Sequence, residues 1–199
     1  MTAYGTWLLP FGRNGLIGAN VSKLVNEFIG GWELDTILNL SSGLPYWPSY
    51  ANCGADRDTG PCTPNILQNA TFPTHLTAYN PATHTRSWFT PVPTMQNEGS
   101  VSGPFQRPLL DQFGNVQRNS FRGPSFFNED LTLQKNFPVK KDIIANFRMD
   151  AFNAFNHINP ANPNSICIDC SVASGAGVIT GEAPGGAPRQ LQFELRVTF

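Results

Sequence analysis

The stretch Arg189-Gln-Leu-Gln-Phe-Glu-Leu-Arg-Val-Thr-Phe199 alternates polar and apolar residues without a break. Successive side chains of an extended chain point to opposite faces, so a two-residue period separates the two kinds. The stretch therefore predicts a β-strand with one apolar face and one polar face. Such a strand fits either a sheet packed on a water-soluble core or the wall of a membrane β-barrel, and the alternation does not choose between them.

Four other segments repeat this alternation less regularly. Each has apolar residues at about every second position and is bounded by Gly, Pro, Asn or Ser. With the last stretch they predict five strands, at residues 3–10, 31–42, 126–137, 142–155 and 188–199. We expect an all-β fold, in which these strands form an antiparallel β-meander.

A different period separates the first two predicted strands. Apolar residues at positions 21, 24, 25 and 28 recur at helical spacing until Gly30-Gly31. This pattern predicts a short amphipathic helix over residues 20–28 that ends at the two glycines and caps the sheet.

The composition of the chain limits its class. Only 14% of the 199 residues are charged, and 18 Gly and 17 Pro make the chain rich in turns, which is not typical of a helical domain. A net charge of -1 provides no basic surface, so we expect no nucleic-acid partner.

No stretch approaches the length of about 18 apolar residues that a membrane helix needs, so any membrane contact would be made by strands. The first residues do not read as a signal peptide, and we expect any export signal to lie outside this sequence.

Two long connections, residues 43–125 and 156–187, are polar and rich in Gly and Pro. Connections of this length are unusual in a compact domain, whereas large membrane barrels have long extracellular loops and short periplasmic turns. If Phe199 lies at the periplasmic end, both long connections fall outside the cell. The turn at residues 138–142 and the helix then fall in the periplasm. We therefore expect two extracellular loops and one short periplasmic helix.

Five blocks, in chain order, resemble a known family. They are Leu9-Pro-Phe-Gly12, Gly30-Gly-Trp-Glu-Leu34 with Ser42-Gly-Leu-Pro-Tyr46, Arg118-Asn-Ser-Phe-Arg-Gly-Pro124 with Asn128-Glu-Asp-Leu-Thr-Leu133, Arg148-Met-Asp-Ala-Phe-Asn-Ala-Phe-Asn-His157, and the last strand. The series resembles the carboxyl-terminal end of TonB-dependent outer-membrane receptors, especially the type with an amino-terminal carboxypeptidase-regulatory-like domain. A final alternating strand that ends on Phe199 also resembles the assembly signal of bacterial outer-membrane β-barrels.

The resemblance covers nearly the whole chain but only a small part of such a receptor, which closes about 22 strands around a plug. It implies a bacterial outer-membrane location and a part in the uptake of large solutes, such as metal chelates, saccharides or peptides. This segment would not transport alone. The implied partners are outer-membrane lipid, the remaining barrel strands and the plug domain, and the barrel-assembly machinery through the last strand. TonB would be a partner only through the missing amino-terminal part. The alternative is a soluble extracellular β-sandwich that binds carbohydrate or protein.

On the barrel interpretation, the apolar face meets lipid and the polar face lines the lumen, where opposite charges on neighbouring strands can pair. The expected lipid-facing residues are Leu131, Leu133, Phe147, Met149, Leu191, Phe193, Leu195 and Val197. The expected lumen-facing polar residues are Glu33, Asp35, Asp130, Arg148, Asp150, Glu194 and Arg196. Glu129 and Lys135 interrupt the apolar face, and the position of Lys135 near one end of its strand would let its stem snorkel. On the sandwich interpretation, the polar set is a solvated face.

The four cysteines form two local pairs, Cys53 with Cys62 and Cys167 with Cys170. An even number of cysteines and close spacing within each pair favour disulfides in an oxidising compartment. A Cys-x-x-Cys pair also occurs in redox and zinc sites. A zinc site of all four cysteines would require the two loops to meet. We expect one disulfide within each loop.

No catalytic constellation emerges from the remaining polar residues. His75, His84 and His157 stand apart in sequence, and no nucleophile motif accompanies them. Asp56 and Asp58 are weak candidates for metal ligands, because the further oxygen ligands of a calcium loop are missing. We expect no enzymatic activity, no cofactor and no resident metal.

Overall fold

The computed structural model describes residues 1–13, 15–49, 62–67, 80–82, 84–88, 99, 101–102, 105–109, 112–164 and 177–199. The chain divides into two compact units. The first, which we call the sheet unit, consists of Met1–Ser41, Phe127–Ile158 and Gly186–Phe199. The second, the connection unit, consists of Ser42–Phe126 and Asn159–Gly185.

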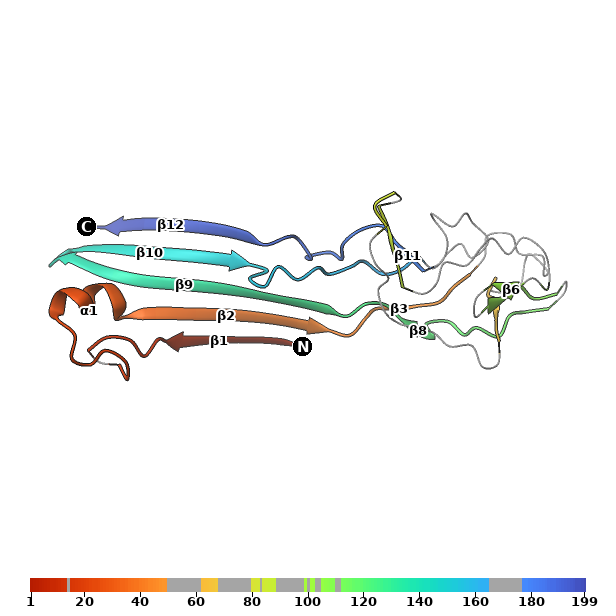
Figure 1. Cartoon of the computed structure of the whole chain (residues 1–199), viewed down its shortest axis with the longest axis horizontal. Helices are drawn as coiled ribbons and strands as arrows, with labels where there is room; N and C mark the ends of the chain where they lie inside the picture. Colours follow the sequence, from red (N-terminus) through yellow and green to blue (C-terminus); the bar gives the residue numbers. More distant parts are fainter. Residues whose placement is uncertain are drawn as a thin grey trace. The chain divides into compact units, whose positions relative to one another are not determined.

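Five long strands form one sheet (Figure 1). They are β1 (Thr2–Leu8), β2 (Trp32–Ser41), β9 (Phe126–Lys140), β10 (Ile143–Phe152) and β12 (Gln190–Thr198), hydrogen-bonded in this order. Neighbouring strands run in opposite directions, and their order in the sheet is their order in the chain. The predicted all-β antiparallel meander with one short helix is therefore confirmed.

The register of the strands sorts the side chains onto two faces. Met149 lies opposite Leu133 of β9 and Phe193 of β12, and Phe147 lies opposite Leu195. Residues that lie directly opposite each other in an antiparallel pair share a face of the sheet. The apolar residues of the last three strands therefore share one face.

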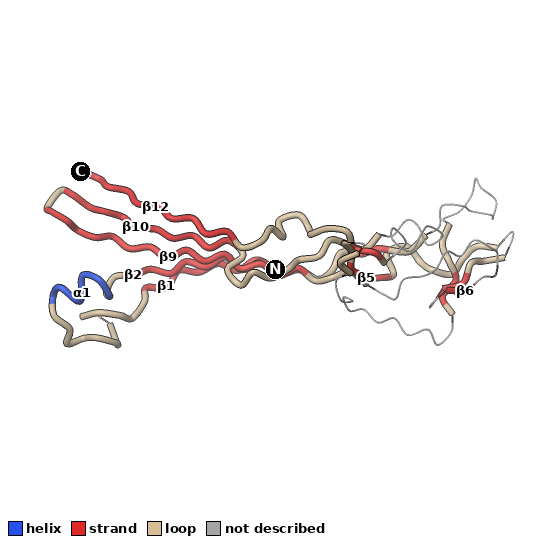
Figure 2. Tube along the Cα trace, turned by 45° about the horizontal axis from the view of Figure 1, so that its top comes forward, coloured by secondary structure: helices blue, strands red, loops and turns tan. Residues whose placement is uncertain are grey.

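The helix α1 (Lys23–Ile29) lies in the connection between β1 and β2 (Figure 2). The Ser22 side chain accepts a hydrogen bond from the backbone N–H of Val25 at 3.3 Å, and this N-cap starts the helix at Lys23 and not at residue 20. The helix ends at Gly30. Gly31 follows with a φ of 73°, a left-handed conformation that suits glycine and turns the chain into β2.

The β9–β10 hairpin is tighter than the sequence predicts. β9 continues through Pro138 to Lys140, so the turn shrinks to Lys141 and Asp142. Pro138 lies opposite Ile144, where the register of the pair shifts. A strand tolerates proline at such an irregularity because no regular ladder hydrogen bond requires its missing N–H.

The connection unit contains short strands that carry no periodic signal in the sequence. β3 (Pro45–Tyr46) pairs with β8 (Phe121–Arg122), and β5 (Arg86–Ser87) pairs with β11 (Val178–Ile179). β4 (Asn65–Ile66), β7 (Phe105–Gln106) and β6 (Val101–Ser102) form a third small sheet. Pairs of two residues are too short to show alternation, which explains why the sequence suggests only irregular loops here.

A small core holds part of the connection unit together. Tyr46, Phe105 and Val116 are buried, and Trp47, Trp88 and Phe121 are among the aromatic residues packed against them. Burial also raises the pKa of the Tyr46 phenol above its ordinary value.

Close backbone contact accompanies the β3–β8 pairing. A Cβ atom on Gly43 would lie only 1.8 Å from the carbonyl oxygen of Gly123, so position 43 cannot carry a side chain without displacing that backbone.

Candidate functional site

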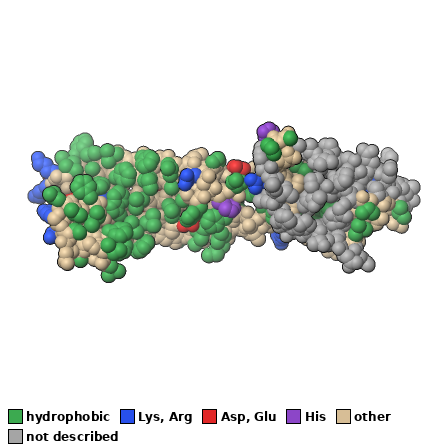
Figure 3. Space-filling model, viewed as in Figure 1, with side chains coloured by type: hydrophobic (Ala, Val, Ile, Leu, Met, Phe, Trp, Pro, Cys, Tyr) green, Lys and Arg blue, Asp and Glu red, His purple; other side chains and the backbone are tan. Residues whose placement is uncertain are grey.

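The apolar face of the sheet is uncovered along β12. Leu191, Phe193, Leu195 and Val197 are 52–71% exposed along β12, and Figure 3 shows apolar side chains gathered over the long strands. Soluble monomers rarely expose contiguous apolar patches of more than a few hundred Å². The sheet therefore presents a surface that requires an apolar environment.

The buried side chains of the sheet unit are polar. Asn128, Lys135, Asp150 and Asn153 are at most 8% exposed, whereas no hydrophobic residue among the described part of this unit is buried. A water-soluble domain has the opposite distribution, with apolar residues inside. The sheet unit thus has no hydrophobic core of its own in the described residues.

Hydrogen bonds between side chains connect the strands across the polar face. Thr6 of β1 donates to Asp35 of β2 at 2.6 Å. The Gln134 amide of β9 donates to Asp35 at 3.2 Å and to Glu33 at 3.3 Å. The carboxylates predicted to share a polar face on β2 therefore do so, and a neutral amide bridges them.

A second group of polar side chains lies on the same face, between β9 and β10. Thr132 donates to Asp150 at 2.5 Å. The Arg148 guanidinium forms an ion pair with Asp150 at 3.0 Å. Sequence reasoning expects pairing between neighbouring strands, but this ion pair joins two residues of one strand, although Glu194 lies opposite Arg148 in the register. An exposed Arg148 side chain makes the pair a weak contributor to stability.

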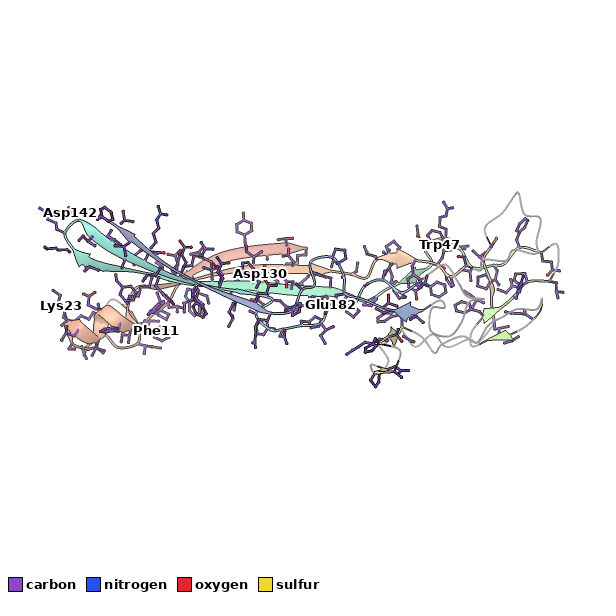
Figure 4. All side chains as sticks on the ribbon, turned by 90° about the horizontal axis from the view of Figure 1, so that it is seen from above. Phe11, Lys23, Trp47, Asp130, Asp142 and Glu182 are labelled. Carbon is purple, nitrogen blue, oxygen red and sulfur yellow. The ribbon has the colours of Figure 1, made fainter. Side chains whose placement is uncertain are left out.

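One end of the sheet is held by Asn153, which follows β10 with a φ of 48°. Its backbone N–H donates to Asp130 at 2.8 Å, and its side-chain amide donates to the carbonyl oxygens of His157 and Ala187, each at 2.9 Å. Asn128 also donates to Asp130, at 2.9 Å. Asp130 therefore organises the chain where β10 ends and the lead into β12 begins, and Figure 4 labels its position on β9. Sequence alternation predicts the face of Asp130 but not this role.

Lys135 lies on the apolar face, directly opposite Phe147, yet it is only 4% exposed. Its ammonium donates hydrogen bonds of 2.5 Å to the backbone carbonyl oxygens of Glu27 and Gly30, at the carboxyl end of α1. The last carbonyls of a helix have no partner within the helix, and a cation placed there satisfies them and interacts favourably with the helix dipole. The lysine therefore fastens α1 to the apolar side of the sheet. Helix carbonyls thus supply the polar partners that water would supply at an exposed lysine.

Aromatic rings surround this lysine. The ammonium lies 4.7 Å from the ring centroid of Phe137 and 5.5 Å from that of Trp32, distances at which a cation is attracted by a ring face. The Trp32 ring meets Phe137 and Phe147 edge to face. Its indole N–H donates to the carbonyl oxygen of Phe28 at 2.9 Å, so a third carbonyl at this end of α1 is satisfied from the sheet.

The other charged residue of the apolar face is also paired. Glu129 accepts a hydrogen bond from the Thr36 hydroxyl of β2 at 3.1 Å. Both charges that interrupt this face thus have polar partners within the sheet unit.

Several predicted site residues lie outside the described residues. These are Asp56, Asp58, His75, Cys53, Cys167 and Cys170. Cys62 is described and is disulfide-bonded, but the structure does not describe its partner, so the two predicted pairings stay predictions.

Within the described residues, no group of three or more His, Cys, Asp or Glu side chains is placed to hold a metal ion. Among the same residues, no helix is both long enough and apolar enough to cross a membrane.

Comparison with known proteins gives one match. Residues 1–192 match the family described as the outer membrane beta barrel domain. Searches of curated proteins and of solved structures find no match. The family match spans four of the five long strands in full and reaches only the beginning of β12, which runs from Gln190 to Thr198.

We predict that Lys135→Met loosens α1 while leaving the sheet intact. Hydrogen bonds to charged groups contribute about 1.5–3 kcal/mol each, and about 1.4 kcal/mol is a factor of ten in an equilibrium. The backbone amides of Asn26 and Gly30, which are hydrogen-bonded within and at the end of α1, should therefore exchange with deuterium at least about tenfold faster. The measurement is hydrogen exchange by mass spectrometry on the membrane-embedded protein.

Lys140→Met is the matched control, because Lys140 is exposed and belongs to the same strand. It should leave the exchange of α1 unchanged. Equal protection of α1 in the Lys135→Met variant and the unsubstituted protein would contradict the assigned role of Lys135.

Proposed function

Since this chain belongs to the outer membrane beta barrel domain family and resides in the bacterial outer membrane, we propose that it is the carboxyl-terminal wall segment of a TonB-dependent receptor. In this role its five strands form part of a large barrel that admits solutes from outside the cell. The observation that carries the proposal is the inverted sheet, with exposed apolar residues and buried polar residues. Five sequence blocks that resemble such receptors, in the same order, support the finer assignment.

The apolar face serves as the lipid-facing wall in this proposal. Membrane β-strands alternate between a lipid-facing apolar side chain and a polar side chain that faces the lumen. The sheet has this arrangement across β9, β10 and β12, where Leu133, Met149 and Phe193 lie in one row. A lipid environment removes the need for a second protein layer over these residues.

The two sheet edges supply the attachment points for the rest of the barrel. β1 pairs only with β2, and β12 pairs only with β10, among the described residues. Unpaired backbone groups within a membrane cost several kcal/mol each, so membrane sheets close on themselves. The remaining strands of the receptor would pair with these two edges.

The positions of the long and short connections support one orientation of the segment in the membrane. The connections from β2 to β9 and from β10 to β12 leave one end of the sheet, whereas the short β9–β10 turn and α1 lie at the other end. Outer-membrane barrels place their long loops outside and their short turns in the periplasm. The connection unit is therefore extracellular in this proposal, and α1 is periplasmic.

The polar face lines the lumen around the plug domain of the receptor. Glu33 and Asp35, held by Gln134, and the Arg148–Asp150 pair would form a hydrated surface for the plug to contact. The solutes implied by the resemblance are large: metal chelates, saccharides or peptides. The extracellular connections, together with the plug, would select among them.

The soluble β-sandwich requires a second sheet across the apolar face. The described residues contain three other sheets, and their strands have two residues each. None of them is long enough to cover strands of nine or more residues such as β12. The barrel wall is therefore the better explanation of the exposed apolar face.

We predict that Leu195→Arg prevents assembly of the protein into the outer membrane. A charge on the lipid-facing side near the bilayer midplane costs about 2–4 kcal/mol, whereas a substitution facing the lumen stays hydrated. Glu194→Gln, on the neighbouring residue and the opposite face, is the matched control and should assemble normally. The measurement is the amount of protein in the outer-membrane fraction, and equal amounts of the two variants would refute the assignment of faces.

Energised uptake is tested by genetics in the cells that make the protein. Deleting its gene should impair growth on one class of large solute as the limiting source of iron, carbon or nitrogen. Deleting TonB should reproduce the same defect, because this class of receptor draws its energy through TonB. A growth defect that persists only in the gene deletion and not in the TonB deletion would contradict a TonB-dependent role.

A further inference from the structure

The helix α1 lies on the side of the sheet that the proposed function assigns to lipid. Lys135, which binds the carbonyl oxygens of Glu27 and Gly30, has its side chain on the apolar face with Leu133 and Phe147. Figure 4, which views the strands from the side, shows α1 standing to one side of their layer. The β1–β2 connection therefore does not continue into the lumen but folds against the outer wall.

The exposed surface of this connection is apolar. Leu24 and Phe28, one helical turn apart on α1, are 76% and 72% exposed, and Leu16, before the helix, is 91% exposed. No residue of α1 is buried. The helix thus contributes no side chain to a protein core in the described part of the chain and directs large apolar groups outward.

Basic side chains accompany this apolar surface. Arg13 and Lys23 belong to the connection, and Lys140 and Lys141 lie at the neighbouring β9–β10 turn; all four are exposed. Figure 3 shows Lys and Arg side chains gathered at this end of the sheet. The acidic residues of the same two segments are Glu27 and Asp142, so basic groups are in excess.

We propose that residues 9–13 and 15–31 are an interfacial anchor, which binds the phospholipids of the periplasmic leaflet beside the barrel. An apolar surface flanked by basic groups is the composition of segments that lie in a membrane interface, with apolar side chains among acyl chains and cations near phosphates. This anchor is continuous with the lipid-facing wall, because Lys135 and Trp32 join α1 directly to that face. The inference rests on the proposed wall and adds a lipid-binding site outside the strands.

The proposed anchor also explains why Lys135 binds backbone carbonyl oxygens of α1. A lysine on a lipid-facing strand would carry an unpaired charge into the membrane. The carbonyl end of α1 supplies its partner, and the same contact holds Leu24 and Phe28 at the interface. The lysine acts as a positioning residue for the anchor and does not itself bind phospholipid.

The test uses the assembled protein in outer-membrane vesicles, with a photoreactive benzoylphenylalanine placed at single positions. Position 28 reports on the anchor, and position 193, on the lipid-facing side of β12, reports on the wall. Position 4, which is 87% exposed on the polar face, is the negative control. After illumination, mass spectrometry detects a mass increase equal to one phospholipid.

We expect phospholipid adducts at positions 28 and 193 and none at position 4. Adducts at 193 combined with only protein adducts or no adduct at 28 would overturn the anchor and leave the wall standing. Absence of adducts at 193 would overturn the proposed wall, and the anchor with it. Position 16 repeats the measurement outside the helix, so a disturbed α1 cannot imitate a negative result.

Discussion

The unpaired backbone at the two edges of the sheet is the constraint on which the rest of the structure depends. β1 and β12 each have one hydrogen-bonded neighbour among the described residues, so one side of each strand offers free N–H and C=O groups. Closed barrels with room for side chains inside begin at about eight strands, and five strands cannot reach closure. The apolar face also requires lipid, because along β12 it has no protein layer over it. A barrel completed by further strands in lipid pairs the backbone groups of both edges and also covers the apolar face.

Two charged residues lie on the apolar face, and their contacts show how the sheet accommodates charge among apolar side chains. Glu129 accepts from Thr36, and Lys135 donates to the end of α1, so each charge has a partner within the sheet unit. The second contact has a structural consequence, since it holds a helix against the apolar side of the sheet. A residue that breaks the alternation thus determines where the β1–β2 connection lies.

The sequence predicts the strands and the helix whose apolar residues recur at a regular spacing, and little else in the structure. The five strands and α1 follow from spacings of two and of three to four residues, and the faces of Asp35 and Phe193 follow from the same period. The contact between Lys135 and Gly30 joins residues 105 positions apart, and nothing local encodes it. The Asn153 contacts depend on a left-handed backbone that alternation does not reveal. The two-residue strands of the connection unit are too short to show any period.

The open edges and the uncovered apolar face are tested most directly by light scattering. The sample is the isolated 199-residue chain in plain buffer, without detergent or lipid. Open edges and an uncovered apolar face predict aggregates or oligomers paired through their strand edges. Supplying further barrel strands and a membrane should convert the chain into a barrel component. A sharp, monodisperse monomer of 21.8 kDa that unfolds cooperatively on heating would contradict the account, because such a chain must have a hydrophobic core of its own.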